Sequence, residues 1–438
     1  MVTQLLLVSN TTIALIMMGR VGAAELAAVG LGTALWIFAY LGCLGLLMAL
    51  SPTIAQHHGA ARPEDVRRSF QQGLWLALIV GLLAWLLVRH IGGVTILMRV
   101  DSNVIPLVKV YLEITAWSMP PTCVYFVFRF LCEGTGHSRP MMLVQILLLP
   151  VAIGLNWILI YGHLGIPAMG VGGAALSATI QSTLTALCMA AYVVKTKRYQ
   201  SFNLFRDFSG PDVVEIVKMT RLGLPIAVTM VLDSSFFSVI ALLMGQLGHI
   251  GLAAHQVVLN YATIVFMIPV GLSSAIMVRV GQSMGRGEVE QARFRGWLGM
   301  AIVVVLLVPF TLLAALVPEF VIHIYTRDSE VVPLAVVLMT VVSGFVVFDG
   351  LKIAGEGALR GMKETTSPMI ISLVSYWFVG FPVAWLLGFN LDIGAVGLWY
   401  GMLVGMVLTA LLMGVRFQLK SDSLVRSLVT RKDFVQRQ

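Results

Sequence analysis

Apolar segments follow one another along almost the whole chain. A helix needs about 20 apolar residues to cross the hydrocarbon of a bilayer, where no water is present to satisfy an open backbone. The sequence therefore predicts an all-α polytopic membrane protein. We count twelve expected transmembrane helices, at 3–19, 26–50, 70–90, 106–131, 141–161, 172–194, 223–246, 251–277, 297–317, 332–358, 368–389 and 396–415.

The composition argues against a soluble enzyme. Of the 438 residues, 58% are hydrophobic and 11% are charged, whereas a soluble domain carries about 25% charged residues. The net charge of +8 comes from basic residues spread over short loops and the tail, so no nucleic-acid partner is predicted. The sequence contains no zinc-ligand spacing, phosphate-binding loop, dinucleotide-binding motif or nucleophile–base pair, and no cofactor is expected. The four cysteines lie inside apolar segments, where inert packing is expected.

Lysine and arginine residues gather in one set of loops and in the C-terminal tail. That set includes Arg139, Arg206, Arg279 and Arg360. Loops rich in these residues stay in the cytoplasm, so both termini are expected there. The opposite set of loops holds only Arg20, Arg89, Arg99 and Arg327.

The two halves of the chain repeat each other. The motif CEGTGHSRPM at 132–141 returns as LRGMKETTSPM at 359–369, and MGVGGAAL at 169–176 returns as IGAVGLWY at 393–400. Further matches follow in the same order at a nearly constant offset. Each repeat holds six expected helices, an even number, so both have the same orientation. They should form two six-helix bundles related by a pseudo-two-fold axis along the membrane normal.

The repeat defines the expected domains. Two matching bundles around a charged face are typical of an alternating-access transporter, with the substrate between the halves near the membrane midplane. The domains are an N-terminal bundle, a cytoplasmic linker, a C-terminal bundle and a basic cytoplasmic tail, at 1–194, 195–222, 223–416 and 417–438.

Three charged residues stand together near the end of one apolar segment. Asp349, Lys352 and Glu356 are spaced by three and four residues, so they lie on one face of a helix. A charge that faces lipid costs at least about 2.5–3.5 kcal/mol. This face should therefore line a protein-enclosed or water-filled cavity and bind an ion or substrate. Lys352 and Glu356 either neutralise each other, or Lys352 pairs with Asp349 and competes with the transported cation.

A second carboxylate, Asp233, stands near the middle of segment 223–246. Two carboxylates in one low-dielectric cavity cannot both stay ionised at low cost, so one holds a proton or the two share a cation. Asp233 and Asp349 are therefore the predicted coupling site, with bound Na⁺ as the alternative to a proton. A cationic substrate would compete for the same negative charge.

Three further residues belong to the predicted binding site. Asn156 is expected to face the interior of the first bundle, and Gln256 to lie near the outer mouth of the second. Phe345 stands one turn before Asp349, among other aromatic residues. An aromatic wall beside carboxylates suits a lipophilic cation. The predicted partners are small organic cations and the lipid bilayer.

Several stretches carry a likeness to one known family: LGLLMALSPTIAQHHGA, NWILIYGHLGIP, RLGLPIAV, AAHQVVLNYATIVFMIP, RVGQSMGRGE and ALRGMKET. They resemble the MATE (multidrug and toxic compound extrusion) transporters, especially the bacterial NorM-type branch. The resemblance implies a two-lobed exporter of the bacterial inner membrane, expected to be a monomer, which exchanges inward Na⁺ or H⁺ for outward cationic, lipophilic drugs. In that branch a helix-7 carboxylate and a helix-10 aspartate bind the cation, and they match Asp233 and Asp349.

The chain departs from the family pattern in its first half. The helix-1 aspartate of the family falls on Ala14, and one of two helix-5 asparagines falls on Ala152, while the other is kept as Asn156. The first-lobe site therefore looks dismantled. Segment 3–19 is also short and polar, which fits a truncated N-terminus.

The second half departs from the pattern as well. An aromatic hydroxyl of the family falls on Phe345, and Lys352 and Glu356 stand where the family is usually uncharged. Coupling is expected to run through Asp233 and Asp349. The coupling ion stays open between H⁺ and Na⁺, and the cationic Lys352 beside the site favours protons.

Two other functions stay open at this point. A lipid or lipid-linked oligosaccharide flippase of the same superfamily would line its cavity with arginine and lysine to hold phosphates, and few basic residues lie at mid-membrane here. A degenerate, non-transporting paralogue would fit the altered first lobe. A membrane enzyme is not expected.

Overall fold

The structure, a computed structural model, describes residues 13–93 and 101–436, with side chains up to residue 427. Within this part of the chain, all regular secondary structure is helical. Ten of the described helices are long and apolar enough to cross a membrane. Large apolar side chains are exposed in rows, as at Leu78, Leu82 and Leu86 of helix α4 (Pro63–Ile91). An exterior of this kind suits a bilayer and not water.

The chain divides into two compact units, Met1–Ala227 and Val228–Gln438. The boundary falls inside one helix, α11 (Val213–Gln246). The predicted boundaries of the bundles, linker and tail stay predictions. Besides α4 and the start of α11, the described elements of the first unit are α2 (Ala23–Met48), α3 (Leu50–Gly59), α6 (Ile105–Thr115), η1 (Ala116–Ser118), α7 (Met119–Gly134), α8 (Arg139–Tyr161), α9 (Gly170–Lys195) and α10 (Lys197–Gln200).

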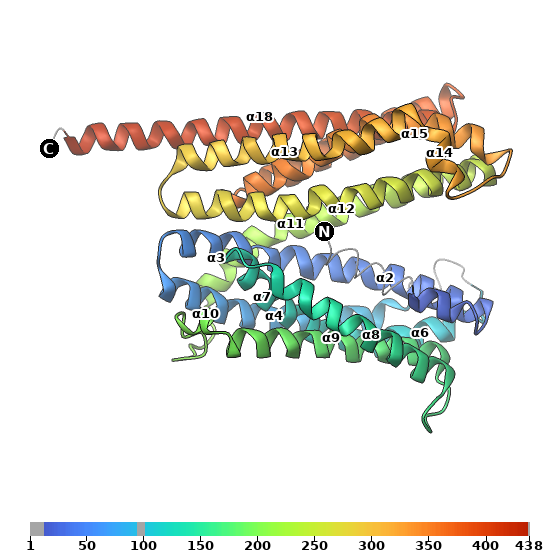
Figure 1. Cartoon of the computed structure of the whole chain (residues 1–438), viewed down its shortest axis with the longest axis horizontal. Coiled ribbons are helices and arrows are strands. Elements are labelled where there is room, and N and C mark those ends of the chain that lie inside the picture. The colour runs from blue at the N-terminus through green and yellow to red at the C-terminus, as the bar shows by residue number, and fades with distance from the viewer. Residues whose placement is uncertain (1–12, 94–100, 437–438) are drawn as a thin grey trace. The chain divides into compact units, whose positions relative to one another are not determined.

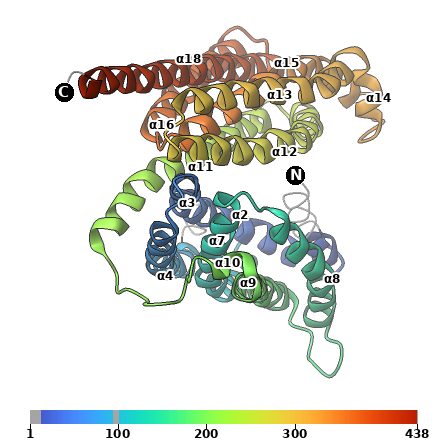
Figure 2. The same cartoon turned by 60° about the vertical axis from the view of Figure 1, so that its left-hand side comes forward.

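Helix α7 lies at the centre of the first unit, since α2, α3, α4 and α9 all contact it (Figure 2). Its apolar face forms the middle of the core. Phe126 and Phe130, one turn apart, are fully buried, and their ring centroids lie 6.0 Å from each other. A helix buried on most sides is apolar nearly all round, as the sequence of this helix is.

The predicted helix at 106–131 is built from three consecutive pieces, α6, η1 and α7. Pro120 and Pro121 stand in the first turn of α7, where a missing amide hydrogen costs little. Each piece is too short to span a bilayer alone, so this segment is not among the ten. The predicted helix at 3–19 is helical at 13–18, and the rest of it lies outside the described residues.

Helix α15 (Val331–Gly361) lies at the centre of the second unit. It packs against α12, α13 and α18, and both views show these helices side by side (Figures 1 and 2). The elements around α15 are α12 (His249–Gly285), α13 (Val289–Leu316), α14 (Pro318–His323), α16 (Thr366–Leu373), η2 (Val374–Gly380), α17 (Phe381–Trp385), η3 (Leu386–Asn390) and α18 (Ala395–Gln436).

Two glycines of α15 bring this helix close to α12. A Cβ atom on Gly357 would stand 2.5 Å from the Ser273 hydroxyl oxygen, and one on Gly361 would stand 2.7 Å from the Met277 carbonyl oxygen. The Ser273 hydroxyl donates to the Ile353 carbonyl of α15 at 2.7 Å. Close approach through small residues four apart is common between membrane helices. It fixes the position of α15 and of its charged face.

The pieces α16 to η3 form one continuous helix with widened, π-type turns in η2 and η3. Pro382 has no amide hydrogen to donate to the preceding turn, and its ring crowds the carbonyl of Phe378, so the helix widens there. Tyr376 of η2 is fully buried. Its ring stacks on that of Phe236 of α11, with centroids 4.9 Å apart.

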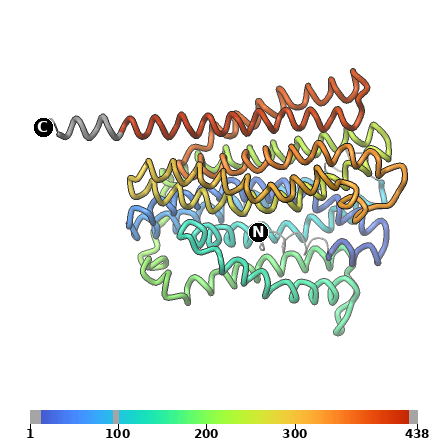
Figure 3. The backbone as a smooth tube through the Cα atoms, turned by 45° about the horizontal axis from the view of Figure 1, so that its top comes forward, coloured from blue at the N-terminus to red at the C-terminus, as the bar shows by residue number. Residues whose placement is uncertain are grey.

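The last helix, α18, has 42 residues, which corresponds to roughly 60 Å, about twice the hydrocarbon thickness of a bilayer. Figure 1 shows its C-terminal part extending past the start of α13, and Figure 3 gives the same helix in another view. Three ion pairs hold the start of this extension. Arg416 and Lys420 bind Glu364 at 2.5 and 3.1 Å, and Asp422 accepts from Arg293 of α13 at 2.7 Å.

Candidate functional site

One face of α15 carries four charged residues that are almost fully buried. Asp349, Lys352 and Glu356 lie there as their spacing predicted, and Arg360 continues the row one turn further. Their exposed fractions are 8%, 2%, 1% and 6%. Arg360 was predicted to lie in a cytoplasmic loop, because the apolar run ends before it. That placement was wrong, since the helix continues to Gly361.

Lys352 binds two carboxylates. Its ammonium donates to Asp233 of α11 and forms an ion pair with Glu356 at 3.4 Å. It also lies over the ring of Tyr376, 5.2 Å from the centroid. The pairing with Glu356 was one of the two predicted alternatives. The other partner is Asp233 and not Asp349, and sequence spacing gave no signal for a partner on a different helix.

Glu356 is itself shared between two cations. Arg360 donates to its second carboxylate oxygen at 2.6 Å, while Lys352 lies near the first. Asp233, Lys352, Glu356 and Arg360 thus form a row of alternating charge that is neutral in sum. Burial of charges is tolerated when each is paired and hydrogen-bonded. Each charge in this row has an opposite charge beside it.

Asp349 stands apart from that row. It is 8% exposed and, among the described residues, forms no ion pair within 4.0 Å. An unpaired buried carboxylate is costly when ionised. Asp349 is therefore the acid of this cluster that most needs a proton or an added cation.

Aromatic side chains cover the cluster on one side. Phe345 is 2% exposed, and its ring lies 6.2 Å from Phe237 of α11 and 5.6 Å from Trp399 of α18. Phe345 therefore lies in an aromatic cluster, and its predicted place in the wall of a binding site stays a prediction. This residue packs inside the unit.

The neighbours His255 and Gln256 of α12 differ in burial. His255 is fully buried beside Trp399, with ring centroids 5.5 Å apart, and neither of its ring nitrogens has a hydrogen-bond partner among the described residues. Gln256 is exposed. His255 thus packs as an apolar residue would, and Gln256 is not part of the charged cluster.

The first unit contains a cavity of about 330 Å³. Asn156 and Ala14 line it, while Ala152 is fully buried on the same helix as Asn156. No charged side chain is among the described residues that line this cavity. Sequence reasoning missed most of its polar lining, since hydroxyl and amide residues in apolar helices give no clear pattern. This lining includes Thr33, Tyr40, Tyr111, Ser118, Thr122, Tyr125, Gln145, Ser177, Gln181 and Thr185.

The repeat relates this cavity to the charged face of α15. Thr122 and Tyr125 of α7 stand 227 residues before Asp349 and Lys352. At the same offset, Arg129 and Glu133 precede Glu356 and Arg360, with the two charges exchanged. Arg129 and Glu133 are buried, 3.9 Å apart. The repeated helices therefore differ in their polar residues. In the first unit, Thr122 and Tyr125 of α7 line the cavity. In the second unit, the matching face of α15 carries paired acids and bases.

The linker before α11 is bound to α4 within the first unit. Gln71 donates to the carbonyls of Leu204 and Arg206 at 3.0 and 3.2 Å, and Gln72 accepts from the Asp212 amide at 2.7 Å. Both glutamines are buried. Two adjacent side chains therefore satisfy backbone groups along the linker.

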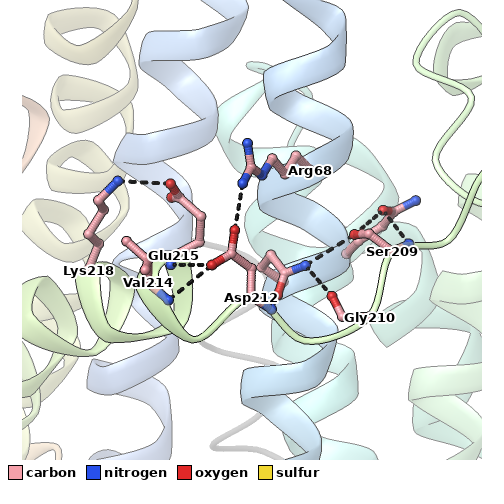
Figure 4. Close-up of polar contacts among 9 residues, drawn as sticks. Arg68, Ser209, Gly210, Asp212, Val214, Glu215 and Lys218 are labelled. Atoms are coloured by element: carbon pink, nitrogen blue, oxygen red, sulfur yellow. Dashed lines mark hydrogen bonds and ion pairs between the residues drawn. The ribbon is translucent and has the colours of Figure 1, made fainter.

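Asp212 joins that linker to the start of α11 (Figure 4). It binds Arg68 of α4 at 2.5 Å and caps the helix by accepting from the amides of Val214 and Glu215 at 3.0 and 3.4 Å. The hydrogen bond from Arg68, helped by these two amides, lowers the pKa of Asp212. An acidic cap is favourable at a helix N-terminus.

A protein-family model described as MatE matches residues 1–158 and 225–386, which is more than half of the chain. The chain belongs to the MatE family. The multidrug resistance protein MdtK of Yersinia pseudotuberculosis serotype O:1b (strain IP 31758) is 34% identical to it over 408 residues, covering 92% of this chain and 89% of that protein. The probable multidrug resistance protein NorM of Shewanella oneidensis is 34% identical over 407 residues, with the same coverage.

Solved MATE structures share the fold of this MatE chain. A MATE protein crystallised in the bent conformation matches with a TM-score of 0.89 at 19% identity, covering 97% of this chain and 94% of that one. The eukaryotic MATE transporter AtDTX14 matches with a TM-score of 0.82 at 21% identity, covering 96% and 94%. At these identities the likeness shows the fold alone.

Family membership confirms the predicted resemblance and the predicted class of all-helical membrane protein. The chain is a MATE transporter and not an enzyme. The roles of Asp233, Asp349, Asn156, Lys352, Glu356, Phe345 and Gln256 in binding stay predictions.

Proposed function

We propose that this chain is a secondary antiporter that exports cationic, lipophilic drugs in exchange for inward H⁺ or Na⁺. Its relatives in Yersinia and Shewanella are named multidrug resistance proteins, which supports small drug-like molecules as substrates. The bacterial inner membrane is the location that fits those relatives.

One observation carries the proposal: the second unit holds two carboxylates inside an apolar helical core, Asp349, which is buried, and Asp233, whose side chain is 19% exposed. A carboxylate at membrane depth is expensive and marks an ion or substrate pathway. Since Asp349 forms no ion pair within the described residues, a proton or a cation must neutralise it. Exchange of that cation for a cationic drug gives antiport.

The first unit supports coupling through the second. Its cavity is lined by hydroxyl, amide and aromatic side chains, with no charge among the described lining residues. A flippase for phosphate-bearing lipids would need arginine or lysine there, so this lining disfavours the flippase alternative. Hydroxyl and amide groups suit hydrogen bonds to a neutral part of a drug.

The proposal includes a twelve-helix topology. The pieces α6, η1 and α7 follow one another without a break in helical backbone geometry, with φ and ψ of −52° and −37° at Ala116 and −65° and −50° at Met119. We count them as one span, and segment 3–19 as the first. With basic residues concentrated in one set of loops, both termini lie in the cytoplasm. The transporter is a monomer.

Ethidium accumulation tests this function in bacterial cells that lack their own efflux pumps. Cells with the wild-type protein should accumulate less ethidium than cells with an empty vector. The Asp349→Asn variant should lose this effect, because an amide cannot exchange a cation. Asp392→Asn is the matched control, since Asp392 is exposed and has a positive φ of 52°, which asparagine accepts well.

Membrane levels of all variants are measured in the same cells by quantitative blotting. Export by the wild type and by Asp392→Asn, without export by Asp349→Asn, supports the proposal. Wild-type cells that match the empty vector at full expression would overturn it for this drug class and favour the non-transporting alternative.

A further inference from the structure

We propose that the Lys352 ammonium is a tethered cation that occupies the Asp233 carboxylate in the place of an exchangeable inorganic ion. Asp349 is then the single exchanging acid of the second unit, and a proton is its coupling ion. This inference rests on the antiport function proposed above and specifies its ion and its stoichiometry.

The ammonium is enclosed as a bound cation would be. It contacts Asp233 of α11, lies 3.4 Å from Glu356 and lies 5.2 Å from the centre of the Tyr376 ring. The Lys352 side chain is 3% exposed. An ammonium carries a unit positive charge and three donors, so it neutralises the carboxylate and takes up Oδ2, while Oδ1 has no hydrogen-bond partner among the described residues. The four-carbon stem prevents it from leaving.

The next turn of α15 holds Lys352 in that position. Glu356 binds Arg360 at 2.6 Å, so its charge is already compensated and its carboxylate is fixed. Two acids and two bases balance each other in this row, and Asp349 is the additional negative charge. Because Asp349 has no basic partner in this row, its carboxylate can bind one additional cation.

The fixed positive charge selects the kind of cation. Around Asp349 the charged and titratable groups are Lys352, Asp233, Glu356 and Tyr376. A sodium ion needs several oxygen ligands, and here Lys352 already holds one oxygen of Asp233, Oδ2, while its charge repels a second cation. A proton needs one carboxylate oxygen and no ligand shell, so Asp349 can bind it without displacing Lys352.

Binding of ²²Na⁺ to the purified full-length protein tests this assignment directly. The wild type should show no saturable binding at millimolar Na⁺. The variant Lys352→Gln should bind Na⁺ at least about a hundredfold more tightly, since a unit charge beside the site is removed. Because this variant leaves excess negative charge, Lys352→Gln/Glu356→Gln serves as the charge-balanced second variant and should also gain binding.

The controls separate this inference from the function on which it rests. Asp233→Asn in the Lys352→Gln background should abolish the gained binding. Na⁺ binding by the wild type as tight as by Lys352→Gln would overturn the assignment, as would absence of binding in both lysine variants when they elute as folded, monodisperse protein. If wild-type cells fail to export ethidium while these binding results hold, the antiport proposal fails and the assignment of Lys352 stands.

Discussion

Lys352 binds two carboxylates from different helices, Asp233 of α11 and Glu356 of α15. Loss of either carboxylate would change the charge balance around the other. Removal of this lysine alone would leave Asp233 without its cation, while Glu356 keeps Arg360, and breaking a buried ion pair typically costs about 3–5 kcal/mol. Replacement of Lys352 together with Glu356 keeps the charge balance. Effects of these residues are therefore not additive, and paired variants are the informative ones.

Glu364, between α15 and α16, is a charged residue outside the membrane-spanning segments. It accepts from Ser367 at 2.6 Å and binds Arg416 and Lys420 of α18 at 2.5 and 3.1 Å. Burial raises the pKa of Glu364, but the hydrogen bonds from Ser367, Lys420 and Arg416 outweigh it, so the pKa lies below the usual 4.5. The ionised carboxylate therefore fastens the start of the α18 extension.

Glu364→Gln should lower the thermal stability of the purified protein at pH 7, by about 1 kcal/mol. A group whose folded pKa is lowered stabilises the fold above its unfolded pKa, and this contribution is lost as the pH falls through the folded pKa. The difference between variant and wild type should therefore shrink below pH 4.5. Melting curves over this pH range measure it, with the exposed Glu330→Gln as control. An unchanged difference at low pH would show that charge is not the cause.

At the scale of elements, the contact between α15 and α12 depends on two small residues. Gly357 and Gly361 let the backbones approach so closely that the Ser273 hydroxyl reaches the Ile353 carbonyl. This contact sets the rotation of α15 and so the direction of its charged face. Without it, Lys352 and Asp233 would not meet.

Gly357→Ala should destabilise the protein, because its Cβ would stand 2.5 Å from the Ser273 hydroxyl and carbonyl oxygens. Gly344→Ala on the same helix is the control. Its Cβ would meet nothing closer than Leu403, at 3.9 Å, and alanine has a better helix propensity by about 1 kcal/mol. Thermal melts of both variants test the prediction, and it fails if Gly357→Ala is as stable as Gly344→Ala.

The linker before α11 is the second element with a specific attachment. The variant Gln71→Ala/Gln72→Ala should release it from α4, because the linker carbonyls and the Asp212 amide lose their buried partners. Limited trypsin digestion should then cut faster after Arg206. Gln200→Ala, at an exposed residue of α10, should digest at the wild-type rate. Equal rates for all three proteins would contradict this account of the attachment.

At the scale of the whole molecule, the two units carry different chemistry on repeated helices. The first unit has an uncharged polar cavity, and the second has a compensated charge row with one surplus acid. The charge-exchanged pairs Arg129–Glu133 and Glu356–Arg360 stand at matching positions of the sequence repeat. The proposed function assigns hydrogen bonding to the first unit and cation exchange to the second.

The sequence predicted the helical membrane class and the shared face of Asp349, Lys352 and Glu356, because helical periodicity and apolar run length are local properties. It did not predict that Lys352 binds Asp233, since that contact depends on how α11 and α15 pack. It misplaced Arg360 because a helix in a protein core can continue past its apolar run when partners compensate the charge. The polar lining of the first-unit cavity was missed because hydroxyl and amide residues within apolar helices give no clear pattern.

Proton movement in proteoliposomes tests the central claim that Asp349 couples drug transport to H⁺. The wild-type protein is reconstituted with a pH-sensitive dye inside, in buffers free of Na⁺, and an ethidium gradient is applied. We expect protons to move against the direction of ethidium, and Asp349→Asn to abolish both movements. Ethidium transport by the wild type with no change in internal pH, or transport that requires Na⁺, would contradict the account.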